Sequence, residues 1–238
     1  LVAGCQVVAV STGGQLAEKA QAAGVPFWRF EHKGQPRAAV GFSFGLLLAM
    51  ITRLGLIPDP THDLQDAIAE MKVQQQEVQA SSPVAKNPAK RMAGQLMGRI
   101  PVILGADFLE PVARRWKGQV SELAKSWGQF EFLPEADHNS LAGIVNPGSV
   151  LEKDLMVLFL RSKVNHPRNL KRIELTRSTM MQAGINTDII ETRGETPLAQ
   201  IWTSLHLGDY TGYYLAMAYQ EDPTPVDALE TFKAEMKS

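Results

Sequence analysis

The sequence lacks the residue patterns that would define a disulfide-bonded, membrane-spanning or metal-binding protein. Cys5 is the only cysteine in 238 residues, so the chain has no internal disulfide and no CxxC metal pair. This fits a reducing compartment and predicts a cytoplasmic location. The longest apolar run, residues 42–51, falls short of the about 20 residues that cross a bilayer. The histidines follow neither HxxxH nor HExxH spacing, so we predict no bound metal.

The chain also has little net charge. Its formal charge is −1 at pH 7, so no strong field recruits nucleic acid or an anionic membrane, and we predict neither as a partner. One basic cluster lacks interleaved aromatic residues and is diluted by acidic neighbours, so a solvated helix face or a subunit contact explains it better than nucleic-acid binding. The cluster consists of Arg161, Lys163, Arg168, Lys171 and Arg172.

The apolar residues that are present indicate an α/β fold. β-rich apolar runs alternate with helical patterns, which favours parallel sheets covered on both faces. The expected strands are residues 6–10, 24–30, 100–104, 129–133, 155–160 and 187–191, and the expected helices are residues 15–23, 38–54, 63–78, 89–97, 110–127, 166–183 and 197–219. Cys5, beside the first strand, is expected in a buried wall rather than as a reactive thiol.

Loop-forming residues divide this pattern into four parts. Residues 1–58 predict part of a first α/β layer, whose other half is absent from the chain. Residues 59–86 predict a linker helix and a boundary loop, with the best boundary signals at Ser81-Ser82-Pro83 and Asn87-Pro88. Residues 87–220 predict a second α/β domain, and residues 221–238 predict a C-terminal helix.

Glu122 and His138 are the strongest candidates for acid–base chemistry. Glu122 lies on the expected helix of residues 110–127, and His138 lies in the turn after the strand of residues 129–133. We therefore expect both side chains to converge at the carboxyl edge of one parallel sheet, where α/β folds place their chemistry. A carboxylate at the edge of a core suits a general base, and a histidine can act as acid or base near neutral pH.

Each candidate also has a plainer interpretation. Glu122 adjoins a stripe of apolar residues that the spacing predicts to be buried: Val112, Trp116, Val120, Leu123 and Trp127. On the polar line with Arg115 and Gln119, the spacing of Glu122 is by itself more typical of a solvated carboxylate beside Lys125 than of a catalytic base. His138 is equally typical of a satisfied surface histidine, and Glu135 is a competing carboxylate in the same turn.

A small polar loop and one arginine offer a candidate binding site. Ser11, Thr12, Gly13 and Gly14 supply hydroxyl and amide groups at a strand-to-helix junction, which suits a hydroxylated or anionic ligand. Such turns are common, and the loop has neither GxGxxG nor GxxxxGK[ST] spacing. Arg37 follows Pro36 at a helix start and can face a ligand or remain a simple surface charge.

Five stretches form an ordered set over nearly the whole chain. They are residues 7–17 (VVAVSTGGQLA), 34–46 (GQPRAAVGFSFGL), 87–104, 115–144 (with WKGQVSE and LPEADHNSLAGI) and 204–233 (with SLHLGDYTGYYLA and DPTPVDALETFK). In this order they resemble the bifunctional phosphoglucose/phosphomannose isomerases of the sugar isomerase (SIS) superfamily. The resemblance implies two SIS-type doubly wound parallel-sheet domains, the first one truncated, followed by a C-terminal helix.

The resemblance also implies roles for individual residues. Glu122 matches the base of the isomerisation, and His138 matches the group that assists opening of the sugar ring. In the family this histidine comes from the neighbouring subunit, so a homodimer with shared active sites is implied. Arg37 is similar to the arginine that stabilises the enediolate. Lys233 resembles the lysine that reaches the ring oxygen, with Lys237 as a possible substitute. The loop from Ser11 to Gly14 resembles one that lines the sugar.

The implied activity is aldose–ketose isomerisation without a cofactor. Glucose 6-phosphate, and mannose 6-phosphate as the second substrate of the bifunctional family, would become fructose 6-phosphate through a cis-enediol; the sequence leaves the choice between these two sugars open. The Ser/Thr-rich phosphate loop of the family is missing from this sequence. Residues 135–139 (EADHN) also depart from the family, which more often has asparagine or another polar residue before the His-Asn pair. The alternative is therefore a non-catalytic SIS module that binds sugar phosphates or regulates through dimer contacts.

Overall fold

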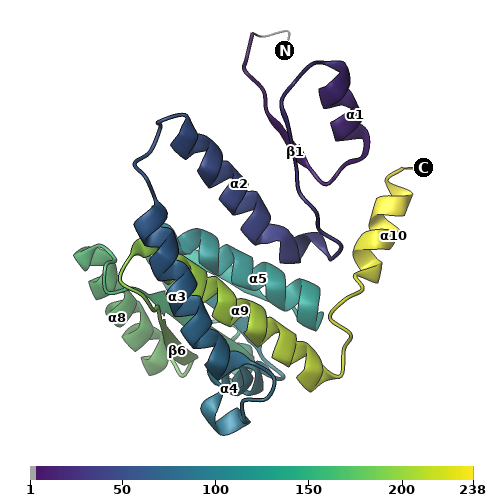
Figure 1. Ribbon diagram of the computed structural model, residues 1–238. Helices are drawn as coiled ribbons and strands as arrows, with labels where there is room; N and C mark the ends of the chain where they lie inside the picture. The colour runs from purple at the N-terminus through teal and green to yellow at the C-terminus, as the bar shows by residue number, and fades with distance from the viewer. Residues whose placement is uncertain (1–3, 238) are drawn as a thin grey trace. The chain divides into compact units, whose positions relative to one another are not determined.

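The computed structural model describes residues 4–237, and the chain divides into two compact units, residues 1–60 and 61–238 (Figure 1). Each unit has its own parallel sheet, so the predicted mixed α/β class is confirmed. Among the residues that the structure describes, every helix is too short or too polar to cross a membrane.

The first unit is a β-α-β element followed by a long helix. β1 (Ala9–Ser11) and β2 (Phe27–Arg29) pair in parallel, and α1 (Gly14–Ala22) connects them. A 3-10 turn, η1 (Pro36–Ala39), leads into α2 (Val40–Arg53). The predicted order of elements is confirmed. The predicted burial of Cys5 is wrong: its side chain is exposed, because the pairing of β1 with β2 begins only at Ala9.

The first unit buries little apolar surface. Among its described residues, the buried apolar side chains are Ala9, Ala20 and Ala39. α2 is rich in apolar residues, yet none of them is buried, and Phe42 and Leu47 are exposed. Because hydrophobic stabilisation grows with the apolar area removed from water, three alanines contribute only a small core.

The second unit is built around a four-stranded parallel sheet. Its strands are β3 (Ile100–Ala106), β4 (Gln129–Leu133), β5 (Leu155–Arg161) and β6 (Asn186–Glu191), in the spatial order β4-β3-β5-β6. All neighbouring strands are parallel. The four strands predicted for this part of the chain are confirmed, with ends that differ by two residues at most.

Helices cover both faces of this sheet because successive side chains of a strand point to opposite faces. Met156, Leu158 and Leu160 of β5 contribute to one core, and Val157 and Phe159 contribute to the other. The first core is covered by α3 (Thr61–Val78), α4 (Pro88–Leu96), α5 (Glu110–Ala124) and α9 (Pro197–Tyr219). The second is covered by α6 (Glu135–His138), α7 (Gly148–Asp154) and α8 (Pro167–Gln182). Short turns, η2 (Val84–Lys86), η3 (Asp107–Leu109) and η4 (Ser140–Gly143), and the last helix, α10 (Asp227–Glu235), complete the unit.

α3 is part of the second unit, although the sequence assigns residues 59–86 to a linker helix and a boundary loop. α3 packs along α9 and buries Ala67, Gln74 and Val78. Tyr214 of α9 also donates a hydrogen bond to the Val78 carbonyl oxygen at 2.5 Å. The division between the two compact units falls before Thr61.

Candidate active site

The topology places Glu122 and His138 at opposite edges of the second sheet. Glu122 lies at the amino edge, where the strands begin, and His138 lies at the carboxyl edge, where the strands end. Glu122 lies near the end of α5, shortly before β4 begins, and His138 follows the end of β4. The five-residue strand β4 between them spans about 16 Å. The prediction that both side chains converge at the carboxyl edge within one chain is therefore wrong. A helix that connects parallel strands returns to the amino edge of the sheet, and Glu122 lies at that returning end.

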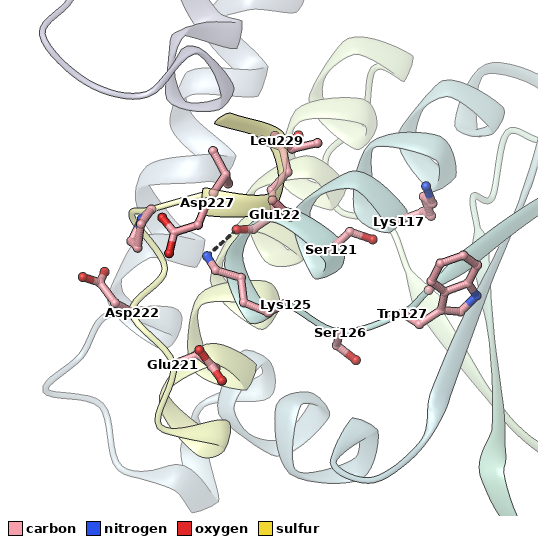
Figure 2. A pocket seen from close by; sticks show the side chains of 14 residues that line it. Lys117, Ser121, Glu122, Lys125, Ser126, Trp127, Glu221, Asp222, Asp227 and Leu229 are labelled. Carbon is pink, nitrogen blue, oxygen red and sulfur yellow. Dashed lines mark hydrogen bonds between the residues drawn. The ribbon is translucent and has the colours of Figure 1, made fainter. Parts of the chain in front are cut away.

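Glu122 lines a pocket of about 630 Å³ at the amino edge (Figure 2). One wall is the end of α5 with the loop that follows it, and the other is the segment between α9 and α10 with the start of α10. A volume of this size suits a small-molecule ligand. The charged residues that line it are Lys117, Glu122, Lys125, Glu221, Asp222 and Asp227.

The face of α5 that carries Glu122 is joined to α9 by one carboxylate. Arg115 Nη2 donates to Asp209 Oδ2 at 2.9 Å, and Gln119 Nε2 donates to Asp209 Oδ1 at 2.8 Å. Gln119 is buried, and Glu122, about one turn further along, is partly buried. The predicted polar line of Arg115, Gln119 and Glu122 is thus a real face of the helix, and its first two members hold α5 against α9.

α5 ends earlier than predicted. Lys125 adopts a left-handed backbone conformation, with φ 52° and ψ 25°, and the helix stops at Ala124. The predicted place of Trp127 in the buried stripe is therefore wrong, because its side chain is 72% exposed beside the pocket, whereas Trp116 and Val120 are buried as predicted. The early stop places the loop after α5 in the pocket wall.

The opposite wall contains a turn around Asp222. The Thr224 backbone N–H donates to Asp222 Oδ1 at 2.8 Å. This hydrogen bond lowers the pKa of Asp222 below its ordinary value of 3.8, and the charge of Lys125 acts in the same direction. Asp222 is therefore ionised at neutral pH, and the pocket carries charges of both signs.

His138 is exposed at the last residue of α6. Its turn is fixed by its neighbours: Asn139 Nδ2 donates to Glu135 Oε1 at 2.9 Å, and Thr176 of α8 donates to Asp137 Oδ1 at 2.5 Å. Glu135, the competing carboxylate, therefore lies with His138 at the carboxyl edge and not in the pocket that contains Glu122.

The candidate residues of the first unit have the local positions that the sequence predicts. Ser11 ends β1 and Gly14 begins α1. Ser11 Oγ donates to the Gly13 carbonyl oxygen at 2.9 Å and accepts from the Gly13 N–H at 3.1 Å, which closes a tight turn with Thr12 at its exposed tip. Gly14 has φ 68°, a conformation that favours glycine. Arg37 lies partly exposed in η1, directly before α2.

Lys233 and Lys237 lie beyond the part of α10 that lines the pocket. Lys233 is exposed one turn after Leu229, the last pocket residue of α10, and Lys237 is exposed after the helix has ended. The choice between these two lysines therefore stays a prediction.

Part of the basic cluster is paired with carboxylates within the protein. Within residues 4–237, no group of three or more His, Cys, Asp or Glu side chains is arranged to hold a metal ion. In the basic cluster, Arg161 forms ion pairs with Glu174 and Glu191, and Lys163 Nζ lies 2.7 Å from Glu195 Oε2. These pairs neutralise much of the cluster, which favours its interpretation as a solvated helix face.

Sequence reasoning missed most of the pocket. Ser121, Lys125 and Ser126 adjoin Glu122 in the chain, and nearness to Glu122 is the only signal that points to them. Asp222 and Asp227 come from a distant segment, and no local pattern joins them to Glu122. Only packing of the whole chain brings these two segments together.

The four-stranded parallel sheet with helices on both faces, and a ligand-sized pocket beside it, define an α/β protein with a candidate small-molecule site. Residues 85–236 match the family model described as the bacterial phospho-glucose isomerase C-terminal SIS domain. This match covers more than half of the chain, and the chain belongs to that family.

Two relatives align with nearly the whole chain. The bifunctional phosphoglucose/phosphomannose isomerase of Caldicellulosiruptor bescii is 32% identical over 231 residues, which cover 97% of this chain and 68% of the relative. The bifunctional phosphoglucose/phosphomannose isomerase of Aquifex aeolicus is 29% identical over 234 residues, which cover 98% of this chain and 68% of the relative. The chain thus spans about two thirds of the length of each.

Two solved structures share the fold. Glucosamine-6-phosphate deaminase from Thermotoga maritima has a TM-score of 0.63 at 12% identity and covers 92% of this chain and 64% of that one. A glucose-6-phosphate isomerase like protein from Thermus thermophilus has a TM-score of 0.60 at 20% identity and covers 68% of this chain and 54% of that one. At these identities the likeness concerns the fold alone.

Proposed function

We propose that this protein is a sugar-phosphate aldose–ketose isomerase that converts glucose 6-phosphate, and also mannose 6-phosphate, to fructose 6-phosphate. The observation that carries the proposal is a partly buried carboxylate, Glu122, in a pocket of ligand size in a chain of this family. The names of the relatives support the same reaction class. Such an enzyme acts in carbohydrate metabolism, and a cytoplasmic location is part of the proposal.

In the proposed mechanism Glu122 moves one proton. After the sugar ring opens, its carboxylate removes the proton from C2 and returns it to C1 through a cis-enediol. A positioned general base contributes about 10²–10⁴ in rate, and stabilisation of the enediolate charge contributes much of the remainder. Arg37 would oppose that charge, Lys233 would reach the ring oxygen, and Ser11 to Gly14 would line the sugar.

We further propose a homodimer in which His138 serves the active site of the partner copy. The topology supports this: Glu122 and His138 lie at opposite edges of their own sheet, so one chain does not bring them together across it. Two copies arranged around a two-fold axis can place the carboxyl edge of one beside the amino edge of the other. Ring opening would then depend on dimerisation.

The arrangement as two SIS-type domains, the first one present in part, belongs to the same proposal. The parallel β1-α1-β2 element of the first unit supports it, because this is the repeating unit of a doubly wound sheet. The polar loop of residues 11–14 follows the carboxyl end of β1, where such sheets bind ligands.

Replacement of Glu122 tests the function. In the complete protein, Glu122→Gln should lower turnover of glucose 6-phosphate by about 10²-fold or more, the effect of losing a general base. It should also stop the wash-in of solvent deuterium at C1 of fructose 6-phosphate, while sugar-phosphate binding persists. Glu110→Gln, at the exposed start of the same helix, is the matched control and should retain turnover.

Two results would contradict the proposal. Undiminished turnover in Glu122→Gln would remove this carboxylate from the mechanism. An unaltered protein that binds sugar phosphate without any proton exchange would favour the non-catalytic SIS module instead.

A further inference from the structure

The wall of the pocket that carries Glu122 ends in an unusual backbone conformation. Among residues 4–237, the non-glycine residues with positive φ are Asp107, Lys125 and Gln220. Lys125 is the residue that ends α5, a position where glycine is preferred because it has no Cβ. A lysine there costs conformational free energy, and such strain is concentrated at functional sites.

The side chain of Lys125 binds the helix end that carries Glu122. Its Nζ donates to the backbone carbonyl oxygen of Glu122 at 2.8 Å (Figure 2). The same Nζ donates more weakly to the backbone carbonyl oxygen of Leu123 at 3.4 Å. The last carbonyl groups of a helix lack intrahelical partners and carry partial negative charge, so an ammonium group stabilises them. Lys125 itself lines the pocket.

The backbone of Lys125 does not need this side chain in order to end the helix. The Lys125 N–H already donates to the Val120 carbonyl oxygen, as the cap requires. Glycine would form the same hydrogen bond without strain. What lysine adds is the ammonium group that ties down the peptide unit of Glu122.

We propose that Lys125 is a positioning residue for the Glu122 carboxylate. This inference rests on the proposed function. By fixing the final turn of α5, Lys125 holds the base at one depth in the pocket. Displacement of a reacting group by about 1 Å can cost about 10²-fold in rate, so a frayed final turn should lower turnover even when substrate still binds.

Three substitutions in the complete protein test the proposal. Lys125→Gly removes both the ammonium group and the backbone strain, so its melting temperature should equal or exceed that of the unaltered protein. Its kcat for glucose 6-phosphate should nevertheless fall about tenfold or more, with KM changed far less. Lys125→Met should show the same loss of kcat. Lys125→Arg keeps a cation at the carbonyl groups and should restore most of the kcat.

Gln220→Gly is the matched control. Gln220 ends α9 in the same left-handed conformation, with φ 60° and ψ 31°, and its side chain is not part of the pocket lining. Relief of strain at this position should leave kcat unchanged. A kcat equal to that of the unaltered protein in Lys125→Gly would overturn the proposal, as would a loss of kcat in Lys125→Gly and Lys125→Met that arginine does not restore. Retained turnover in Glu122→Gln would instead overturn the proposed function, so the two failures are distinguishable.

Discussion

The two edges of the second sheet use their polar groups differently. At the carboxyl edge the groups satisfy one another: Asp107, after β3, accepts hydrogen bonds from Asn165 Nδ2 at 2.9 Å, the His166 N–H at 3.0 Å and Asn169 Nδ2 at 2.7 Å. At the amino edge, the segments that follow α5 and α9 line a pocket with charged side chains. The carboxyl edge is therefore closed by its own hydrogen bonds at the end of β3. Further along this edge, Arg161, Lys163 and Glu191 line a second pocket of about 480 Å³, and the amino edge presents the pocket of about 630 Å³ that contains Glu122.

Under the proposed function, the site of this sheet departs from the common location of a site in an α/β fold. Ligands usually bind where the strand order reverses, at the carboxyl ends of the strands. In this sheet that point lies between β3 and β5, and Asp107 and Asn165 bridge it. The pocket with the candidate base is instead built from helix ends at the opposite edge. The site has to be found from side chains and not from topology alone.

The largest expected effect comes from disturbing the closed edge at Gly105. A Cβ atom at this position would lie 2.3 Å from the Leu109 carbonyl oxygen and 2.6 Å from its carbonyl carbon. Backbone atoms cannot move aside cheaply, so Gly105→Ala should lower the free energy of unfolding by about 3 kcal/mol or more, measured by chemical denaturation.

Gly118→Ala provides the control for this substitution. Gly118 lies within α5, and a Cβ atom there would meet no atom within 4 Å. Alanine should therefore stabilise the protein by about 0.5–1 kcal/mol. Equal effects of the two substitutions would mean that the turn after β3 is not tightly packed, and the contrast between the edges would lose its basis.

A smaller effect is expected from Asp107→Asn. Burial acts to raise the pKa of Asp107, but hydrogen bonds from the His166 N–H, Asn165 and Asn169 outweigh it and hold the pKa below the ordinary 3.8. A depressed pKa means that the ionised carboxylate stabilises the fold above pH 3.8, and that this stability is lost as pH falls through the folded-state value. Because the residue is exposed to solvent, the loss at neutral pH should be only about 1 kcal/mol.

The pH dependence of unfolding checks this interpretation. Below pH 4, the unaltered protein should lose a component of stability that Asp107→Asn lacks. Asp154→Asn, at an exposed position on α7, should retain the full acid response. An identical loss of unfolding free energy below pH 4 in all three proteins would show that the loops after β3 and β5 do not hold Asp107 in its ionised form.

The strands of the second unit could be predicted because their apolar, β-branched runs are bounded by clear turn signals. The polar line on α5 could also be predicted, because helical spacing alone places Arg115, Gln119 and Glu122 on one face. The end of α5 could not be predicted, because no glycine marks it and lysine rarely takes the left-handed conformation. The error at Trp127 followed from that missing signal.

The prediction that Glu122 and His138 converge was wrong for a different reason. Periodicity shows which face of an element a residue occupies, but the edge of the sheet depends on the direction in which the element runs. The connection from β3 through α5 to β4 reverses that direction, and Glu122 comes late in the helix. The pocket wall from α10 was also beyond local patterns, because contacts between distant segments depend on the packing of the whole chain.

The smallest expected effect sharpens the comparison at the open edge. Trp127 lines the pocket and is 72% exposed, so Trp127→Ala should change the free energy of unfolding by no more than about 0.5 kcal/mol. Trp116 is the contrast: it is 1% exposed, and its Nε1 donates to the Ser204 carbonyl oxygen at 2.8 Å. Trp116→Phe should cost about 1–3 kcal/mol because it removes a buried hydrogen bond and leaves part of the volume of the indole ring empty. A comparable loss in Trp127→Ala would mean that the pocket wall is itself packed in the folded protein, and the amino edge would then be as closed as the carboxyl end of β3.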